Sequence, residues 1–243
     1  MWGINAVRRC SRTLAALALG LLALRASAAP ELPSISRPDL AQQLQVGDLL
    51  FIRVSALPFR KVAETTNSWT NHVGIVVATD GAEPEVAEST FPVSKRGSLE
   101  RFLARSEGGR VEVSRLNTPL TAEQQRALVD AAQARIGVFY DTGFDLQSPR
   151  QFCSRFVHEV LRTASGIEVG KVETFATLLA RNPAADQAFW KYWYFGQIPW
   201  ERQTVTPASV MNSAQVHAVF DGYVVTSAAK QRRQDIAQSL PSL

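Results

Sequence analysis

The sequence predicts an α+β domain in which an antiparallel sheet packs against one cysteine-bearing helix. Three short apolar segments have the composition of strands, and two of them are joined across a turn at residues 80–81. A later segment, residues 152–164, repeats its apolar residues at helical spacing and ends before Gly166. One face of this helix therefore belongs to the core, and its first turns carry Cys153.

The first 28 residues have the features of a secretory signal. Three arginines precede an apolar run from residue 14 to 24, and the small residues 26–28 fit cleavage before Ala29. A continuous run of about a dozen apolar residues is shorter than the roughly 20 that span a bilayer. We therefore expect a secreted, periplasmic protein with no transmembrane span after cleavage. A retained anchor is the alternative.

The basic character of the chain comes from this segment. Four of the 26 basic residues lie in residues 1–28 and none of the 22 acidic residues does, so the remainder carries 22 of each. A balanced remainder gives no reason to expect a nucleic-acid partner.

The number of cysteines limits the roles that a thiol can have in this protein. Cys10 leaves with the signal, so the mature chain keeps only Cys153, in an oxidising compartment and without a partner for a disulfide. Such a thiol is either buried and inert or kept for its chemistry. The helix dipole lowers a cysteine pKa by less than about one unit. A nucleophilic Cys153 therefore requires a neighbouring base.

The rest of the chain divides into three parts. Residues 29–40 are rich in Pro and Ser and predict a loose lead-in. The main folded domain is expected over residues 41–227, which is enough for one core. Residues 228–243 form a polar tail.

Strand and helix signals follow one another through this domain. The segments predicted as strands are residues 49–54, 71–78, 85–89 and 110–116, and the first opens with an unbroken apolar run, Leu49–Ile52, as suits burial on both faces. Residues 57–71 indicate a loop with a helical turn. Helices are predicted over residues 98–105, 121–135 and 174–181.

Two helix starts carry capping signatures. Thr121 and Gln124 form a capping box for the helix that ends at Gly137. Ser148, with Pro149 next and Gln151 three residues after it, forms another that places the helix start close to Cys153.

The aromatic run at residues 190–195 precedes Pro199. Its usual meaning is core or a covered groove wall, and a substrate platform is the alternative.

The hairpin brings an imidazole and a carboxylate together. His72 and Glu88 each lie roughly eight residues from the turn, so they are expected nearly opposite one another. A carboxylate beside an imidazole fixes its tautomer and raises its basicity. Glu85 is the competitor, but a separation of three residues puts it on the other face of the strand.

The other histidines have structural interpretations. His158 lies five residues after Cys153, about 140° away around the helix, so it points away from the thiol. A metal site built from Cys153, His72 and His158 fails on this geometry, and the chain has no ligand pair at zinc spacing. His217 is expected to be structural. We expect no metal and no cofactor.

These motifs, in this order, resemble the circularly permuted branch of the NlpC-type, papain-like cysteine hydrolases, close to the YiiX-like group. In unpermuted relatives the Cys-Ser helix comes first and the Gly-Asp and His-Val-Gly strands follow. The resemblance covers residues 45–165, and residues 205–209 resemble a segment near the end of such proteins. The motifs that carry it are Gly47–Phe51, His72–Val76, Glu88, Tyr140-Asp141 and Phe152–Val157.

The resemblance implies a papain-like fold and a set of roles. Cys153 would be the nucleophile, His72 the base and later the acid, and Glu88 the group that orients His72. Tyr140 would lie beside the thiol and help the oxyanion site.

The function expected from the resemblance is a thiol hydrolase that cleaves an amide bond through an acyl-enzyme. The compartment and the superfamily point to peptidoglycan peptides as substrate. Lipid ester or amide hydrolysis, or acyl transfer, is an alternative within the same fold. Phe152 before the cysteine and Ser154-Arg155 after it differ from the lecithin:retinol acyltransferase-like branch, which has Asn before and Glu-His after.

Two classes of protein without catalysis remain as alternatives. One is a cell-wall-binding module that keeps the fold and uses its groove to hold a fragment. The other is a structural envelope protein in which the aromatic run at residues 190–195 is an interface.

Overall fold

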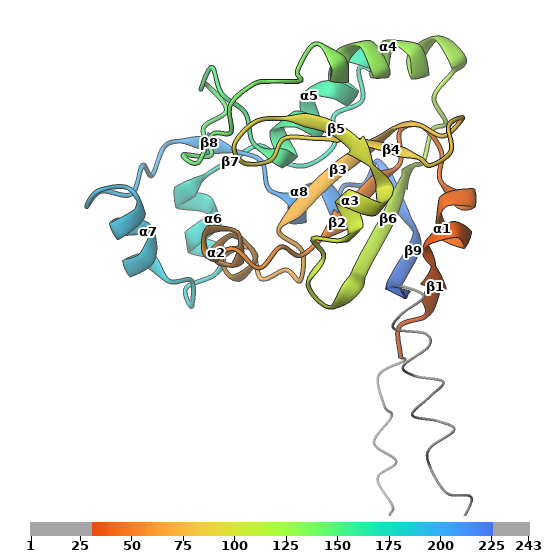
Figure 1. Cartoon of the computed structure of the whole chain (residues 1–243). Helices are drawn as coiled ribbons and strands as arrows, with labels where there is room; N and C mark the ends of the chain where they lie inside the picture. Colours follow the sequence, from red (N-terminus) through yellow and green to blue (C-terminus); the bar gives the residue numbers. More distant parts are fainter. Residues whose placement is uncertain (1–30, 226–243) are drawn as a thin grey trace, which may run out of the picture. The chain divides into compact units, whose positions relative to one another are not determined.

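The computed structural model of the chain describes residues 31–225 (Figure 1). The expected signal at residues 1–28 and the polar tail at 228–243 lie outside the described residues. From Leu32 on, the described chain belongs to one compact unit.

A seven-stranded sheet forms the centre of this unit. Its strand order is β1-β9-β6-β2-β3-β4-β5, in which β1 runs parallel to β9 and the other neighbours are antiparallel. The mixed α+β class with an antiparallel-dominated sheet is thus confirmed. The strands are β1 (Ser34–Ser36), β2 (Leu49–Ile52), β3 (His72–Ala78), β4 (Glu85–Glu88), β5 (Lys95–Ser98), β6 (Arg110–Leu116) and β9 (Val216–Val225).

The remaining elements are helical apart from a small two-stranded sheet of β7 (Glu173–Thr174) and β8 (Gln203–Thr204). A 3-10 turn covers Glu107–Gly109. The helices are α1 (Arg37–Gln43), α2 (Leu57–Thr65), α3 (Leu99–Leu103), α4 (Ala122–Gln133), α5 (Cys153–Ser165), α6 (Phe175–Arg181), α7 (Gln187–Trp193) and α8 (Pro207–Met211). No helix within the described range 31–225 combines the length and apolarity that crossing a bilayer requires.

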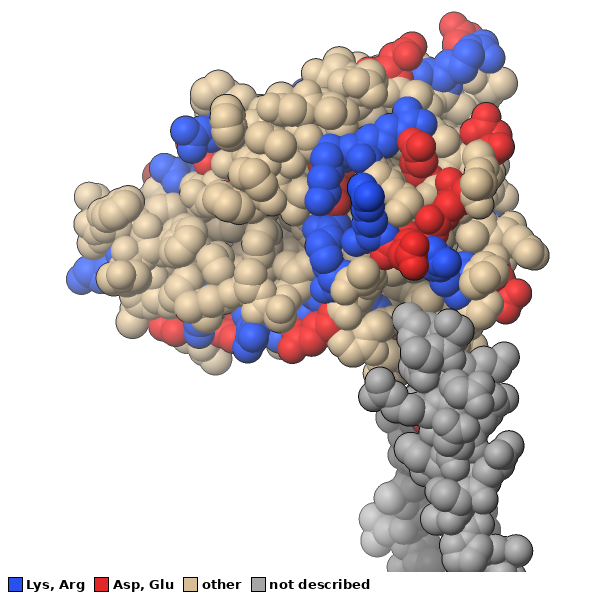
Figure 2. All heavy atoms as spheres, in the orientation of Figure 1, with Lys and Arg blue, Asp and Glu red and all other residues tan. Residues whose placement is uncertain are grey.

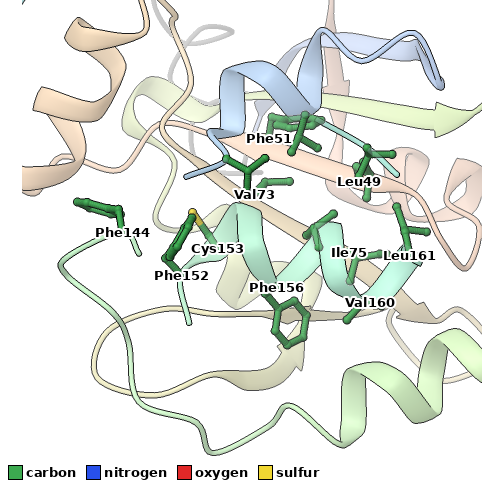
Figure 3. Packing of buried hydrophobic residues seen from close by; sticks show 14 of the residues in the cluster. Leu49, Phe51, Val73, Ile75, Phe144, Phe152, Cys153, Phe156, Val160 and Leu161 are labelled. Carbon is green, nitrogen blue, oxygen red and sulfur yellow. The ribbon is translucent and has the colours of Figure 1, made fainter. Parts of the chain in front are cut away.

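Both faces of the sheet are covered, which explains the unbroken apolar run of β2. Leu49 and Phe51 pack with α4 and α5 on one face, whereas Leu50 and Ile52 pack with α1 and α3 on the other. Side chains alternate between faces along a strand, so a strand with two buried faces is apolar at every position. Figure 3 shows α5 laid on the first of these faces, with Val160 and Leu161 directed into its core.

Most predicted elements are confirmed. The strand at 110–116 matches β6, and Thr121 with Gln124 forms the capping box of α4. Ser98 caps α3, which ends two residues before Arg105. Thr174 caps α6.

The loop with a helical turn predicted for residues 57–71 underestimates the helix, because Leu57–Thr65 forms α2. Pro58 lies in the first turn of α2, where a missing N–H costs nothing and the fixed φ favours the helix. A proline taken as a loop signal therefore starts a helix here.

The loose lead-in predicted for residues 29–40 is also wrong where the structure describes it. Ser34–Ser36 pairs with β9 as an edge strand, and Ser36 caps α1 through the amide of Asp39. The Pro and Ser content therefore reflects an edge strand and a helix start, both of which tolerate these residues.

The capping box predicted at Ser148–Gln151 does not form. Instead Gln151 makes an isolated parallel bridge with Tyr140, and the N-cap of α5 is Phe152, in extended conformation with no side-chain cap. The predicted start near Cys153 and stop at Gly166 are confirmed, the latter with φ of 73°. The bridge to Tyr140 keeps Gln151 out of the helix, so the capping sequence at Ser148 does not start one.

Candidate active site

Cys153 is the first residue of α5, and its side chain is 3% exposed. In Figure 3 its sulfur projects from the start of the helix toward Val73. No side chain caps this end of the helix, so the first-turn amides keep their donor capacity. A helix N-terminus favours negative charge nearby, here a thiolate or an oxyanion.

His72 and Glu88 meet on the sheet. His72 is the first residue of β3 and Glu88 the last of β4, and His72 Nε2 lies 2.5 Å from Glu88 Oε2. The register pairs Ile75 with Ala87, which places Glu88 opposite Gly74 when continued by one step. The two side chains are therefore diagonal neighbours on one face. The hairpin count had predicted them nearly opposite one another, which differs by two residues in register.

Glu85 lies on the other face, as predicted. Its carboxylate pairs with Arg96 at the surface and makes no contact with His72.

Arg105 completes the polar cluster, and the sequence reasoning did not assign it a role. Its Nη2 lies 2.6 Å from both oxygens of Glu88, and its Nη1 donates to Thr90. The residue follows α3, on the face of the sheet where Phe102 packs against His72. The sequence does place Arg105 at the end of the predicted helix 98–105, but no local pattern indicates that its side chain would bond Glu88.

The buried carboxylate is held ionised. Burial by itself raises the pKa of Glu88, but hydrogen bonding and charge from His72, together with Arg105, outweigh it and lower the pKa to about 2. Glu88 is therefore an anion throughout the neutral range.

The imidazole is held protonated by its two neighbours. Burial lowers the pKa of His72, but the negative charge of Cys153, together with the hydrogen bond and charge of Glu88, raises the pKa to about 9. Burial raises the pKa of the Cys153 thiol, whereas His72, the Val73 amide and Tyr140 lower it by more, so the net shift is downward. The pair thus favours thiolate and imidazolium.

The two imidazole nitrogens have different surroundings. Nε2 bonds Glu88, whereas the buried Nδ1 has no hydrogen-bond partner among residues 31–225. Since Glu88 occupies Nε2, Nδ1 is the nitrogen left to exchange a proton with Cys153.

Tyr140 lies beside the thiol. Its hydroxyl donates toward Cys153 Sγ over 4.0 Å, and burial followed by the charge of Cys153 raises its pKa well above the ordinary value. Tyr140 therefore stays protonated and remains a donor. Phe59 of α2 packs edge-on against both Tyr140 and His72, which shields the site from water.

A cavity of about 40 Å³ adjoins Cys153. Helices α2, α6 and α7 and the segment before α8 close it, and its wall is largely aromatic and aliphatic. Trp190 of the aromatic run is part of this wall and is buried, whereas Tyr192 and Phe195 are exposed. The run is thus divided between groove wall and surface.

The remaining histidines lie elsewhere, as predicted. His158 is buried, with Nδ1 2.7 Å from the Val169 carbonyl oxygen. His217 is exposed and lies 2.8 Å from Asn117 Oδ1. Over the described residues, no three or more His, Cys, Asp and Glu side chains come together as metal ligands.

The chain matches the sequence model of a known family over residues 43–220. The family is described as the permuted papain-like amidase enzymes, YaeF/YiiX, C92 family. This match confirms the family resemblance found in the sequence.

A relative and a solved structure agree with it. The uncharacterized protein YiiX of Escherichia coli strain K12 is 31% identical over 185 residues, which cover 76% of this chain and 90% of YiiX. The crystal structure of YiiX from Escherichia coli O157:H7, described as a metalloprotein, superposes with a TM-score of 0.68 at 30% identity. That alignment covers 74% of this chain and 99% of the other.

Proposed function

Because the chain belongs to the permuted papain-like amidase family, we propose that it is a periplasmic cysteine amidase that acts through an acyl-enzyme on Cys153. The observation that carries the proposal is the buried Glu88–His72 pair, whose imidazole is influenced by the charge of Cys153: the carboxylate bonds Nε2, and Nδ1 has no hydrogen-bond partner among the described residues. A thiolate, an oriented imidazole and a nearby donor are what acyl transfer requires.

The reaction would proceed in two steps. The Cys153 thiolate adds to the amide carbonyl carbon, and the oxyanion faces the Cys153 amide and the Tyr140 hydroxyl. His72 then gives its proton to the departing amine as the C–N bond breaks. A water molecule attacks the thioester, His72 takes its proton, and the carboxylic acid and free thiolate are released.

The substrate we propose is a peptide amide of the cell wall. The amidase family supports an amide bond, and the features of a secretory signal in residues 1–28 support an extracytoplasmic compartment, where peptidoglycan peptides are found. A lipid ester or amide is the second candidate, because the cavity beside Cys153 is lined mostly by apolar side chains.

The proposal is tested by the pH dependence of Cys153 alkylation with iodoacetamide, in a Cys10→Ser background that leaves one thiol. We expect labelling with an apparent pKa well below the reference of about 8.5. His72→Ala removes the imidazolium and should raise that pKa. His158→Ala is the matched control, because this second buried histidine bonds a carbonyl oxygen away from the thiol.

Slow labelling with an ordinary or raised pKa, indifferent to His72, would contradict the amidase. The fold would then serve as a binding module for cell-wall fragments. Labelling that responds equally to His72→Ala and His158→Ala would indicate general loosening of the core.

A further inference from the structure

We propose that the cavity beside Cys153 is an acyl-side specificity pocket for a short, uncharged, apolar group. This inference rests on the proposed function, because it takes the acyl part of the amide as the occupant. To the proposed amidase activity it adds the chemical class of the acyl group that the site would select.

The wall of the cavity is mostly apolar and comes from segments spread between Phe59 and Pro207. Besides Cys153 and its neighbours it includes Phe59, Phe144, Phe175, Leu178 and Trp190. All but Phe59 are buried, and none of the Lys, Arg, Asp or Glu side chains of the described residues lines the cavity. An occupant therefore gains from removal of apolar surface, and it finds no charge in the wall apart from that of the Cys153 thiolate.

Several polar groups in the wall are already engaged by the protein. Thr65 accepts the indole N–H of Trp190 at 2.7 Å, and Ser154 donates to the Val205 carbonyl oxygen at 2.8 Å. The Asn71 amide bonds the backbone of Val54 through both its oxygen and its nitrogen. A carboxylate entering the cavity would lose its hydration without a charged partner, which costs several kcal/mol.

The position of the cavity identifies which part of the substrate it holds. Phe152, Cys153 and Ser154 all line it, so it adjoins the start of α5, which carries the thiol. The amine leaves when the C–N bond breaks, whereas the acyl group stays on the sulfur until water releases it. A group held against Cys153 through both steps is therefore the acyl group.

The size of the cavity limits that group. The cavity is small, about 40 Å³, which favours a short acyl group over a long one. A butyryl chain and the side chain of a valine- or alanine-type residue both satisfy this limit. A glutamyl side chain is excluded by charge, and an octanoyl chain by length.

The test uses the full chain in the Cys10→Ser background and a series of 4-nitroanilides that differ only in the acyl part. The alkanoyl arm contains acetyl, butyryl and octanoyl, and the peptide arm contains N-acetyl-alanyl, -valyl and -glutamyl. We expect kcat/KM to be highest for butyryl in one arm and for alanyl or valyl in the other. Octanoyl and glutamyl should be at least about tenfold slower. The faster arm identifies whether the apolar group belongs to a lipid or to a peptide.

Two variants of Leu178 change the pocket in opposite directions. Leu178→Ala enlarges it and should move the alkanoyl optimum toward octanoyl. Leu178→Phe fills it and should leave acetyl as the best substrate. Leu179→Ala is the matched control, because Leu179 is the next residue of α6 and is buried in the core without lining the cavity. It should lower the thermal midpoint and leave the optimum unchanged.

The outcomes separate the two proposals. Turnover that is fastest for the glutamyl compound, or an optimum that does not move in either Leu178 variant, overturns the acyl pocket while acylated Cys153, detected by mass spectrometry, still supports the amidase. Absence of any acylation, together with slow iodoacetamide labelling, overturns the amidase and the pocket with it.

Discussion

Two sides of Cys153 are built in opposite ways. The sheet side presents Arg105, Glu88 and His72 as a chain of charges, in which each group bonds the next. The helical side presents α2, α6 and α7, whose inner surfaces are aromatic and aliphatic. On the face shown in Figure 2, charged residues gather over the sheet and α3, and the part that carries α6 and α7 is mostly uncharged.

The charged side has no redundancy. Glu88 holds His72 and is itself held by Arg105, so loss of Glu88 changes the pKa of His72, and loss of His72 or Arg105 changes the pKa of Glu88. The aromatic side is redundant, since Phe144, Phe175, Trp190 and Tyr194 form several edge-to-face or stacked contacts with ring centroids 5.5 to 6.4 Å apart. We therefore expect substitutions on the first side to act on rate and pH dependence, and those on the second to act on stability and specificity.

The largest expected effect is that of His72→Ala on turnover. Removal of the base and acid should lower kcat/KM by about 10³-fold or more while thermal unfolding shows a folded protein. His158→Ala should lower stability and change kcat/KM by less than threefold or so. Equal loss of activity in the two variants would remove the distinction between the charged side and the rest of the core.

On the aromatic side, Trp190→Ala should lower the free energy of unfolding by about 3–5 kcal/mol, because it leaves a cavity and unpairs Thr65. Urea denaturation measures this change. Tyr192→Ala, on the same helix but 82% exposed, should remain within about 0.5 kcal/mol of the wild type. A small effect at Trp190 would mean that α7 adds little to the core.

The next effect concerns pH. Activity requires a protonated His72 to supply the departing amine, so the rate should fall as pH rises through the His72 pKa of about 9. Glu88→Gln removes an anion that raises this pKa, so the alkaline limb of kcat/KM should move toward the ordinary value of 6.5. An unmoved limb would show that Glu88 does not act through His72.

The smallest effect should be that of Arg105→Gln. Arg105 acts on His72 only through Glu88 and is partly exposed, so the alkaline limb should move in the same direction by less than in Glu88→Gln. The double variant should resemble Glu88→Gln alone, because Arg105 has no other route to the imidazole. Additive shifts in the pH profile would contradict this order of dependence.

Local patterns of the sequence determined much of this protein. The period of two placed His72 and Glu88 on one face of neighbouring strands, and the helical period from Phe156 to Leu161 defined the buried side of α5. The capping box at Thr121 and the glycine stop at Gly166 were equally local, and both are present. These features depend on residues a few positions apart, so short-range physics decides them.

Tertiary structure decided the rest. The predicted cap at Ser148 lost to a bridge between Gln151 and Tyr140, which pairs segments that the sequence does not mark as strands. Arg105 reaches Glu88 only because α3 folds back on the sheet, and the cavity beside Cys153 is assembled from residues between Phe59 and Pro207. Such contacts depend on how distant segments pack, and no periodicity or cap within one segment encodes that packing.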